Sequence, residues 1–445
     1  MGRPLDPFTG DSELPARTGV VVIGGGIIGV ATALELAERG VPTVLCEKGV
    51  IGGEQSSRNW GFCRQMGRDP REVPLAMESL RLWRRMNERV GAETGFRQAG
   101  IIYLAETEAW LAGQSRWADE HARPYQLETR VLTPDEAARV MPGATERWKG
   151  AIYTASDGRA EPSKAAPALV AAAQRAGAKI FTGCAVRGLD LAAGRVAGVV
   201  TEKGRIACEQ VVLAGGAWSR RFCGNHGIEL PQLMVVNSVQ RTEPIEAGIE
   251  VSGKCERFAL RRRLDGGYTV AHGMLSMADI VPDSFRLFFA FLPAIDLREL
   301  RFRIGRRFIE EWRLPRRWSL DATSPFEQVR VLDPEPVRSL LDSPLRDLKR
   351  MFPAFRDARV AERWAGYIDA TPDAVPVISP VDGVPGFYLA TGFSGHGFGI
   401  GPGAGKLMAD IVTGVTTPVV DPAPFRYSRF INGSKIAPMV ARYGG

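Results

Sequence analysis

A glycine-rich turn near the start of the chain has the spacing of a dinucleotide-binding loop. Gly24, Gly26 and Gly29 form a G-x-G-x-x-G pattern. In such loops the first glycine allows a tight turn, the second lets a pyrophosphate approach the backbone, and the third lets a helix pack closely on a sheet. Glu47 follows 23 residues after Gly24, at the distance where an acidic side chain binds a ribose hydroxyl. The turn predicts a site for the ADP part of FAD or NAD, and the pattern alone does not distinguish the two.

Three later segments combine small residues with hydrogen-bonding or aromatic side chains. They are residues 52–61, 211–219 and 391–405. The first follows the glycine turn closely, the second continues a predicted strand, and the third leads into a predicted helix. A flat ring that lies against the backbone needs this combination, although residues 52–61 taken alone are equally compatible with a surface loop.

The elements that would position these residues are spread over the chain. Val20–Ile23 is a run of apolar, β-branched side chains typical of a buried parallel strand, and residues 28–39 and 41–46 complete a βαβ unit. Further strands are predicted at residues 179–181, 196–200, 210–214 and 386–389, and helices at residues 75–92, 161–175 and, after the glycine-rich run, up to residue 412. One domain built from separated segments fits this order better than tandem domains.

Composition limits the class of protein. Of the 445 residues 45% are hydrophobic and 24% are charged, which excludes disordered and collagen-like chains. A net charge of +7 gives no case for nucleic acid, and four histidines with six scattered cysteines form no zinc motif. We expect reduced thiols and a cytoplasmic location, since the first residues have no apolar signal region.

Six segments occur in a fixed order along the chain: V-V-V-I-G-G-G-I-I-G, S-S-R-N, D-G-R-A-E-P-S-K, V-V-L-A-G-G-A-W-S, R-W-A-G-Y-I-D-A-T-P-D-A-V-P-V-I and G-F-S-G-H-G-F-G-I-G-P-G-A-G. Together they resemble the FAD-dependent D-amino acid oxidase, glycine oxidase and sarcosine oxidase family. The resemblance covers roughly residues 19–415. It implies an α/β protein in which a Rossmann-like FAD-binding domain is interleaved with a mixed-sheet, α+β substrate domain.

The resemblance also implies domain boundaries. The FAD-binding domain would comprise residues 19–80, 150–230 and 361–420, and the substrate domain residues 81–149 and 231–360. Residues 1–18 and 421–445 would be terminal extensions.

The residues that would bind FAD follow from the same motifs. Gly24, Gly26, Gly29 and Glu47 would hold the ADP half, Val186 would contact adenine, and Lys48, Ser56, Ser57 and Arg58 would follow the ribose, pyrophosphate and ring. Ala214, Gly215 and Trp218 resemble the second dinucleotide loop, and Gly395, His396, Gly397, Phe398 and Gly399 resemble the loop at the pyrimidine edge of the flavin. Ile27, Ile28, Gly53, Gln55 and Asn59 complete the predicted set.

Two departures from the family concern the flavin and the substrate. Gly366 stands where covalent-flavin members carry a cysteine, which favours non-covalent FAD. Ile368 stands where glycine oxidase-like members carry an arginine for the substrate carboxylate. Arg64 has the spacing at which sarcosine oxidases place such an arginine, and an arginine fork suits a carboxylate. A surface cation is an equal alternative.

His272 and Tyr367 are the other candidates for the substrate site. His272 follows a strand that resembles the one reaching the flavin edge, but a core histidine is the simpler interpretation. Tyr367, in the W-A-G-Y motif, would line the pocket or pack in the core. We predict no metal site.

The resemblance implies oxidation of a C–N bond in an amino acid or related small amine. Hydride would pass to flavin N5, the imine would be hydrolysed, and oxygen or another electron acceptor would reoxidise the flavin. Three alternatives stay open: a dehydrogenase that passes electrons to a quinone or protein carrier, an enzyme that acts on a modified nucleoside in RNA, and a non-catalytic FAD-binding interaction module.

A basic segment, residues 298–317, runs from Arg298 to Arg317 with eight arginines and three glutamates. Its apolar residues fall near helical spacing, which favours a solvated helix with one buried face. Docking to an acidic protein or to an anionic membrane surface is the alternative.

Overall fold

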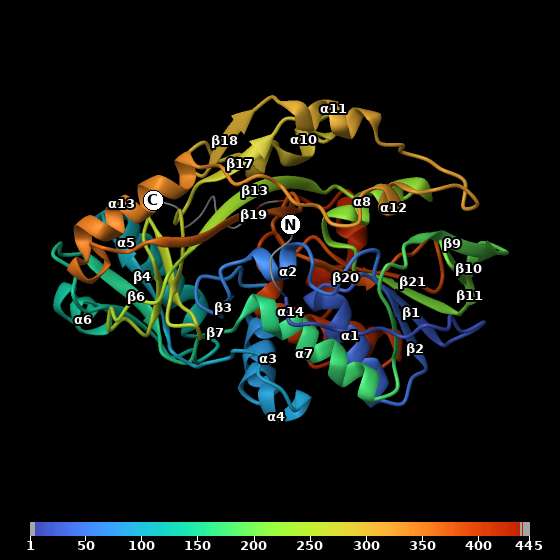
Figure 1. The fold of residues 1–445 in the computed structure, drawn as a ribbon, viewed down its shortest axis with the longest axis horizontal. Helices are drawn as coiled ribbons and strands as arrows, with labels where there is room; N and C mark the ends of the chain where they lie inside the picture. The colour runs from blue at the N-terminus through green and yellow to red at the C-terminus, as the bar shows by residue number, and fades with distance from the viewer. Residues whose placement is uncertain (1–4, 437, 439–445) are drawn as a thin grey trace.

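A six-stranded sheet forms the centre of one half of the molecule (Figure 1). The structure is a computed structural model that describes residues 5–436 and 438. The strand order is β20 (Val377–Pro380), β21 (Phe387–Thr391), β12 (Gln210–Leu213), β1 (Val20–Ile23), β2 (Thr43–Cys46) and β8 (Lys179–Phe181). Neighbouring strands are parallel except β20 and β21. The predicted strands of the βαβ unit therefore lie in one parallel sheet.

The central strand β1 is buried on both faces. Val20 and Val22 belong to one apolar cluster and Val21 and Ile23 to another, as expected where alternate side chains point to opposite faces. Helices α1 (Ile27–Glu38), α7 (Pro162–Arg175) and α14 (Gly397–Val412) cover the first face. An antiparallel sheet of β9 (Val186–Ala192), β10 (Arg195–Thr201) and β11 (Gly204–Ala207) covers the second. The carboxyl ends of the strands are then the place for a ligand.

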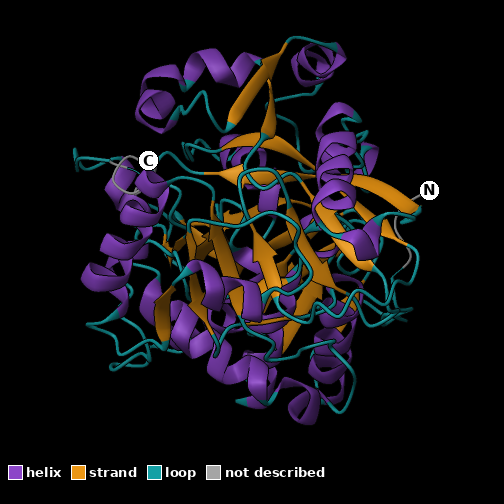
Figure 2. Cartoon of the chain, turned by 90° about the vertical axis from the view of Figure 1, so that its left-hand side faces the viewer, coloured by secondary structure: helices purple, strands orange, loops and turns teal. Residues whose placement is uncertain are grey.

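A ten-stranded mixed sheet forms the other half, and in Figure 2 its strands lie between helices. Its order is β18 (Leu300–Arg303), β17 (Ser276–Asp279), β13 (Leu233–Thr242), β16 (Tyr268–Ala271), β15 (Ala259–Arg262), β14 (Ser252–Lys254), β4 (Ile101–Ala105), β6 (Gly150–Thr154) and β5 (Thr129–Leu132), with β19 (Val360–Ala370) paired to β13. Helices α5 (Glu108–Trp117), α6 (Pro134–Val140) and α13 (Ser339–Met351) pack on this sheet.

The chain alternates between the two sheets, which confirms the predicted α/β class with an interleaved mixed-sheet half. The residue boundaries of the two domains stay a prediction, and β19, assigned by them to the FAD-binding domain, pairs with β13. The shorter elements include α2 (Gln55–Arg58), β3 (Phe62–Cys63), β7 (Gly158–Arg159), α8 (Ser219–Asn225) and α12 (Pro325–Gln328).

Both terminal extensions contact the first half. The Asp11 carboxylate accepts the N–H of Ile180 at 2.9 Å. Near the other end, Arg429 Nε forms an ion pair with Asp373 at 3.0 Å, and the Tyr427 hydroxyl donates to the carbonyl of Glu229 at 2.7 Å. The described parts of the extensions are thus fixed to the body of the molecule.

The glycine-rich run is a helix over most of its length, whereas its composition predicts a loop. α14 begins at Gly397 and includes Gly399, Gly403 and Gly405. An added Cβ on Gly405 would lie 2.6 Å from Ala31 of α1, and one on Gly403 would lie 2.8 Å from the carbonyl oxygen of Leu75. Close packing between backbones, rather than loop conformation, explains these glycines.

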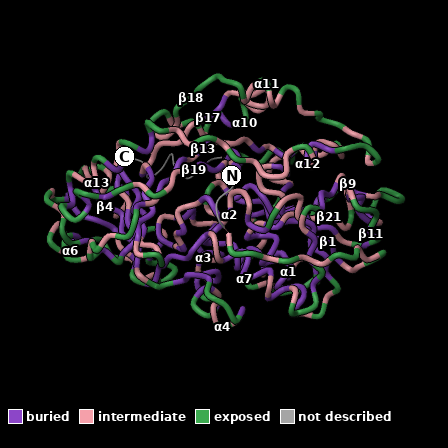
Figure 3. The backbone as a smooth tube through the Cα atoms, in the orientation of Figure 1, coloured by how far each residue is buried: buried purple, intermediate pink, exposed green. Residues whose placement is uncertain are grey.

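Two predicted helices also differ from the structure. Residues 75–92 form two helices, α3 (Val73–Arg84) and α4 (Met86–Val90), which are separated at Arg85. Residues 298–317 contain the strand β18 and the short helix α11 (Arg306–Arg313), and α11 has no buried residue. The prediction of a single helix with one buried face is wrong, because Leu300–Arg303 pairs with β17 as an edge strand. Figure 3 shows this region mostly in the colours of exposed and intermediate residues.

Candidate active site

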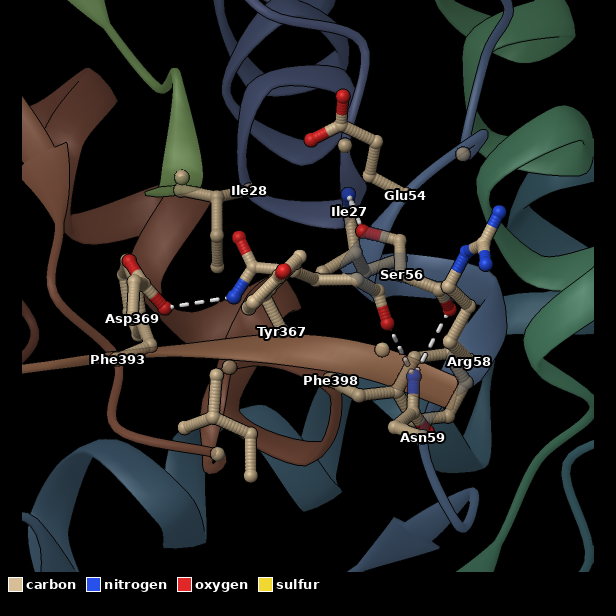
Figure 4. Close-up of a pocket in the computed structure, with 18 of the residues that line it drawn as sticks. Ile27, Ile28, Glu54, Ser56, Arg58, Asn59, Tyr367, Asp369, Phe393 and Phe398 are labelled. Atoms are coloured by element: carbon tan, nitrogen blue, oxygen red, sulfur yellow. Dashed lines mark hydrogen bonds between the residues drawn. The ribbon is translucent and has the colours of Figure 1, made fainter. Parts of the chain in front are cut away.

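A cavity of about 390 Å³ opens at the carboxyl ends of β1, β2 and β12. This volume lies within the range of about 300–1,000 Å³ typical of small-molecule sites. Side chains from the second sheet, Asn237 and Tyr367, complete its walls. All but three of the predicted cofactor and substrate residues line the cavity, the exceptions being Gly29, Ser57 and His272. Figure 4 shows part of this lining, with Ser56, Arg58 and Asn59 on one side and Tyr367 and Asp369 on the other.

The glycines of the predicted dinucleotide turn have distinct steric roles. Gly24 has a φ of +109°, and an added Cβ would lie 2.4 Å from the carbonyl oxygen of Ala214. A Cβ on Gly29 would lie 1.9 Å from the carbonyl oxygen of Gly24. At Gly26 an added Cβ meets, among the described residues, only Ser56 Oγ, at 3.1 Å. The backbone is therefore packed on one side and accessible at Gly26, as a pyrophosphate cradle at a helix N-terminus requires.

Glu47 and Ser56 hold this turn in place. The N–H of Ile27 donates to Ser56 Oγ at 2.8 Å, across a gap of 29 residues in the chain. The Glu47 carboxylate accepts the N–H groups of Gly25 at 2.7 Å and Gly49 at 2.6 Å. Burial raises the pKa of Glu47. The predicted ribose-binding residue thus also ties β2 to the turn.

The predicted ring segment forms the short helix α2, and its side chains fix its position. Gln55 Nε2 donates to Asp369 Oδ1 at 2.8 Å, and Gln55 Oε1 accepts the N–H of Ala217 at 3.0 Å. Asn59 Oδ1 accepts the N–H of Gly61 at 2.8 Å. Helix α2 is therefore joined to β19 and to the loop after β12.

Arg58 is buried against β19. Its guanidinium donates to the carbonyl oxygens of Gly53 at 3.2 Å and Ala365 at 2.9 Å, and it forms an ion pair with Asp333. A Cβ on Gly366 would lie 2.8 Å from the Cβ of Arg58. A cysteine at position 366 would therefore displace Arg58, which agrees with the absence of that residue type here.

Lys48 lines the cavity but is engaged by protein groups. Its Nζ donates to Glu54 Oε1 at 2.6 Å and to the carbonyl oxygens of Val329 and Arg330, both at 2.9 Å. It also lies 4.6 Å from the centre of the Trp218 ring, whose Nε1 donates to Glu54 at 3.1 Å. These contacts fix the segment around residue 330 beside the cavity.

The N-terminus of α14 carries a buried histidine–carboxylate pair. His396 Nδ1 lies 3.1 Å from Glu72 Oε2. Burial and the neighbouring Arg68 lower the pKa of His396. Burial by itself would raise the pKa of Glu72, but His396, Arg68 and Arg64 outweigh it and hold that pKa below its usual value. Because an ionised carboxylate can only accept, Nδ1 of His396 is the donor in this pair.

Two arginines reach the cavity near this pair. Arg64 has its guanidinium carbon 5.5 Å from the centre of the Tyr103 ring and donates to the carbonyl of Met66. Arg68 is buried, its Nη1 has no hydrogen-bond partner among the described residues, and burial lowers its pKa to about 10. Asp157, which holds the backbone N–H groups of Gln65 and Met66, has its pKa raised by burial to about 7. The cavity thus contains cationic groups that are incompletely matched by acids.

The two remaining substrate candidates differ in position. His272 Nδ1 accepts the N–H groups of Met274 at 3.2 Å and Leu275 at 3.1 Å, so this ring stabilises a turn and does not line the cavity. Tyr367 lines the cavity, and the guanidinium of Arg307 lies 5.2 Å from the centre of its ring. Burial raises the pKa of Tyr367.

The cavity residues that the sequence analysis missed include Arg68, Tyr103, Lys254, Glu299 and Asp369. Asp369 stands next to Ile368 in the matched β19 motif, so the motif itself could have indicated it. The other four carry no local signal, because their side chains meet only through the tertiary fold. Lys254 Nζ, for example, lies 4.8 Å from the Tyr103 ring, to which Arg64 is also close.

Comparison with known proteins agrees with this geometry. Residues 19–411 match the family model described as DAO, FAD dependent oxidoreductase. The chain belongs to this family. It is 27% identical to glycine oxidase from Pseudomonas aeruginosa over 91% of this chain and 97% of that protein.

Solved structures give the same result. L-amino acid deaminase from Proteus myxofaciens, solved with anthranilate, has a TM-score of 0.93 and 36% identity, with 96% of this chain and 97% of that chain covered. L-proline dehydrogenase from P. horikoshii has a TM-score of 0.78 and 26% identity over 95% of this chain and 100% of that chain. The predictions of an FAD-dependent DAO-family enzyme that oxidises C–N bonds in amino acids or related amines are confirmed at this level.

Two further findings concern metal sites and membrane-spanning helices among the described residues. Within residues 5–436 and 438, no group of three or more His, Cys, Asp or Glu side chains has a metal-binding arrangement. None of the described helices is long and apolar enough to cross a membrane.

Proposed function

We propose that the enzyme oxidises the C–N bond of an α-amino acid or N-alkyl amino acid whose carboxylate lies against Arg64 and Arg68. The observation that carries this proposal is Arg68, which lines the cavity beside Arg64 and whose buried Nη1 lacks an acceptor among the described residues. A buried N–H group without an acceptor is costly, and arginine forks bind carboxylates in two-point contacts. The anthranilate in the Proteus myxofaciens structure, an aromatic carboxylate, supports the same ligand class.

We infer that FAD binds along the predicted residues without a covalent bond. The turn at Gly24 and Gly26 with Glu47 would hold the ADP part, α2 would border the ring, and the N-terminus of α14 at Gly397 would face its pyrimidine edge. FAD supplies the two-electron oxidation when it is bound. The positive end of α14 would favour negative charge at that edge.

The chain's own groups would position the substrate and exclude water. Trp60 and Phe62 line the cavity in an edge-to-face pair with ring centres 5.6 Å apart, and Trp60 Nε1 donates to Asn237 at 3.2 Å. Tyr367 adds an aromatic wall from β19. Placing the substrate Cα against the ring is the main contribution of such a site, because orientation removes a large part of the barrier. No strong general base is required.

The electron acceptor is oxygen or another acceptor, and we propose a cytoplasmic location without a nucleic-acid partner. All six cysteines are buried free thiols, as a reducing compartment allows. Peroxide production during turnover separates an oxidase from a dehydrogenase that passes electrons to a quinone or protein carrier.

Anaerobic bleaching of the flavin tests the proposed substrate class. The panel pairs D- and L-amino acids and N-methyl amino acids with the amines that lack only the carboxylate. We expect amino acids to reduce the flavin and their decarboxylated partners to do so at least about 100-fold less efficiently, a difference of about 2.7 kcal/mol. Equal reduction by both partners would reject carboxylate recognition, and no bleaching by any compound would favour a non-catalytic FAD-binding module.

A further inference from the structure

The segment 282–317 carries an unusual concentration of exposed apolar side chains. It contains α9 (Pro282–Arg286), α10 (Phe288–Phe291), β18 and α11, and we call it the outer segment. Ten of the eighteen exposed large hydrophobic residues of the described chain lie here: Phe285, Phe288, Phe289, Leu292, Ile295, Leu297, Phe302, Ile304, Ile309 and Trp312. Isolated exposed apolar residues are normal, whereas a contiguous group of this kind marks an interaction site.

These side chains are exposed because the outer segment projects from the second sheet. In Figure 1 its labels α10, α11 and β18 lie along the upper margin of the molecule. β18 is the edge strand and pairs only with β17 in that sheet order. Phe289 is 85% exposed, Ile304 79% and Trp312 71%, so water surrounds them rather than protein. Nothing in the described fold covers this surface.

The same segment is basic. It holds nine arginines and five acidic residues, a net +4 of the chain's +7. Several arginines pair with these acids, as Arg306 does with Glu310 at 2.7 Å. Arg301 and Arg313 have no acidic partner within 4.0 Å among the described residues. The exposed surface therefore combines large apolar side chains with uncompensated positive charge.

We propose that the outer segment docks the enzyme on an anionic lipid bilayer. Phenylalanine, leucine and tryptophan beside arginine are the composition of segments that lie in the membrane interface, and each arginine near an anionic leaflet adds to the attraction. A second copy of the chain fits less well, because a two-fold interface brings the same positive patch against itself. The contact is interfacial, since no described helix is long and apolar enough to span a membrane.

Docking would bring the active-site cavity close to the bilayer. Glu299 at the start of β18 and Ser276 of β17 line the cavity, and Arg307 of α11 lies over the ring of Tyr367 in its wall. The outer segment is thus continuous with one side of the cavity. The docking itself is independent of the proposed flavin chemistry.

Vesicle sedimentation of the full-length, flavin-loaded enzyme tests the proposal. The probes are vesicles of phosphatidylcholine alone and of phosphatidylcholine with phosphatidylglycerol in a 3:1 ratio. We expect binding to the anionic vesicles at least tenfold tighter than to neutral ones, and weaker binding as salt is raised. Absence of binding to the anionic vesicles would overturn the proposal.

Three double variants locate the contact: an apolar pair in the outer segment, a matched apolar control pair elsewhere, and an arginine pair in the outer segment. Ile304→Ser with Trp312→Ser should reduce anionic-vesicle binding at least tenfold, whereas Val131→Ser with Ile431→Ser, at exposed positions elsewhere, should not change it. Arg301→Gln with Arg313→Gln should remove most of the preference for anionic over neutral vesicles. Unchanged flavin content and melting temperature establish that each variant is folded. Equal losses in the test and control pairs, or none in either, would overturn the location.

Two other outcomes would replace the bilayer with a different partner. A dimer seen by light scattering that disappears in the Ile304→Ser, Trp312→Ser variant, without vesicle binding, would assign the surface to a second copy of this chain. Salt-sensitive binding to polyglutamate, again without vesicle binding, would assign it to an acidic protein.

Discussion

Arg68 has different expected effects on substrate binding and on stability. Its guanidinium is buried, and Nη1 has no acceptor among the described residues. A buried N–H without an acceptor destabilises a fold, whereas the charge of Arg68 stabilises the ionised form of the buried Glu72. An anionic substrate group would supply the missing partner, so the two properties can be separated by substitution.

Arg68→Met should therefore raise the KM for a carboxylate substrate by about 100-fold, since removing one partner of a buried charge pair costs about 2–5 kcal/mol. The melting temperature should change little, because the unsatisfied N–H and the favourable charge beside Glu72 are lost together. Steady-state kinetics and thermal melting measure the two effects. Arg139→Met, at an exposed position of α6, is the control. A lower melting temperature with an unchanged KM would assign Arg68 a structural role.

Gly366 bears on how the flavin is held. A side chain at this position would collide with Arg58, whose guanidinium also bonds to the neighbouring carbonyl of Ala365. We expect acid precipitation of the purified yellow protein to leave the flavin in the supernatant. Flavin that stays with the pellet through denaturing washes would show a covalent bond at another residue.

His226 gives the protein a stability that depends on pH. Its Nε2 accepts the N–H of Leu189 at 3.0 Å, and burial lowers its pKa to about 4 from 6.5. The unfolded chain then takes up the proton first, so stability is complete above pH 6.5 and falls as the pH drops to about 4, by up to about 3 kcal/mol. Denaturant unfolding of wild type and His226→Gln over this range should give a flatter curve for the variant. Parallel curves would exclude His226 as a source of the pH dependence.

For single residues, the sequence could predict candidate cofactor-binding residues better than candidate substrate-binding residues. Glycine spacing and small-residue loops are local patterns, and of the predicted cofactor residues all but Gly29 and Ser57 line the cavity. Gly29 was predicted for close helix packing, which its position beside the Gly24 carbonyl explains. Arg68 could not be separated from the other arginines, because only tertiary contacts determine which of them is buried without a partner.

The glycine-rich helix α14 shows how far the sequence could predict secondary structure. Five glycines and Pro402 within residues 397–405 are unfavourable for an isolated helix. The packed sheet and helices reverse that preference, because only a helix without side chains on this face can approach α1 and α3 so closely. Residues 395–399 of the run line the cavity, but composition could not predict the conformation of the run.

Gly405→Ala measures this packing. Replacing glycine by alanine in a helix gains about 1 kcal/mol, but the new Cβ would lie 2.6 Å from Ala31, and such overpacking costs typically about 1–3 kcal/mol. We expect a net loss of stability in denaturant unfolding. Gly224→Ala in α8, where no atom of the described residues lies within 4 Å of the added Cβ, should be neutral or stabilising. The same sign for both variants would contradict the close approach of α14 to α1.

The molecule as a whole places the cavity where the two sheets meet. Glu47 follows β2 of the first sheet and Tyr367 belongs to β19 beside the second, and both line one cavity. A ligand that bridges the halves stabilises their joint native state by mass action.

Addition of FAD to apoprotein should therefore raise the melting temperature. At a hundredfold excess over Kd the stabilisation is about 2.7 kcal/mol. Riboflavin, which lacks the ADP half, should give a much smaller shift, because the turn at Gly24 would stay unused. Differential scanning fluorimetry with the two ligands compares these shifts. Equal shifts would place the binding energy in the ring alone.

The order of strands in the first sheet has a consequence for synthesis of the protein. β1 ends at residue 23, but its neighbour β12 begins at Gln210, and β12 in turn pairs with β21 at Phe387–Leu389. At about 5–20 residues per second, one edge of β1 stays open for on the order of 10–40 s while the ribosome makes the intervening chain. The nascent N-terminal segment therefore needs protection from aggregation. We expect the yield of folded, full-length protein to depend on chaperones that bind emerging chains.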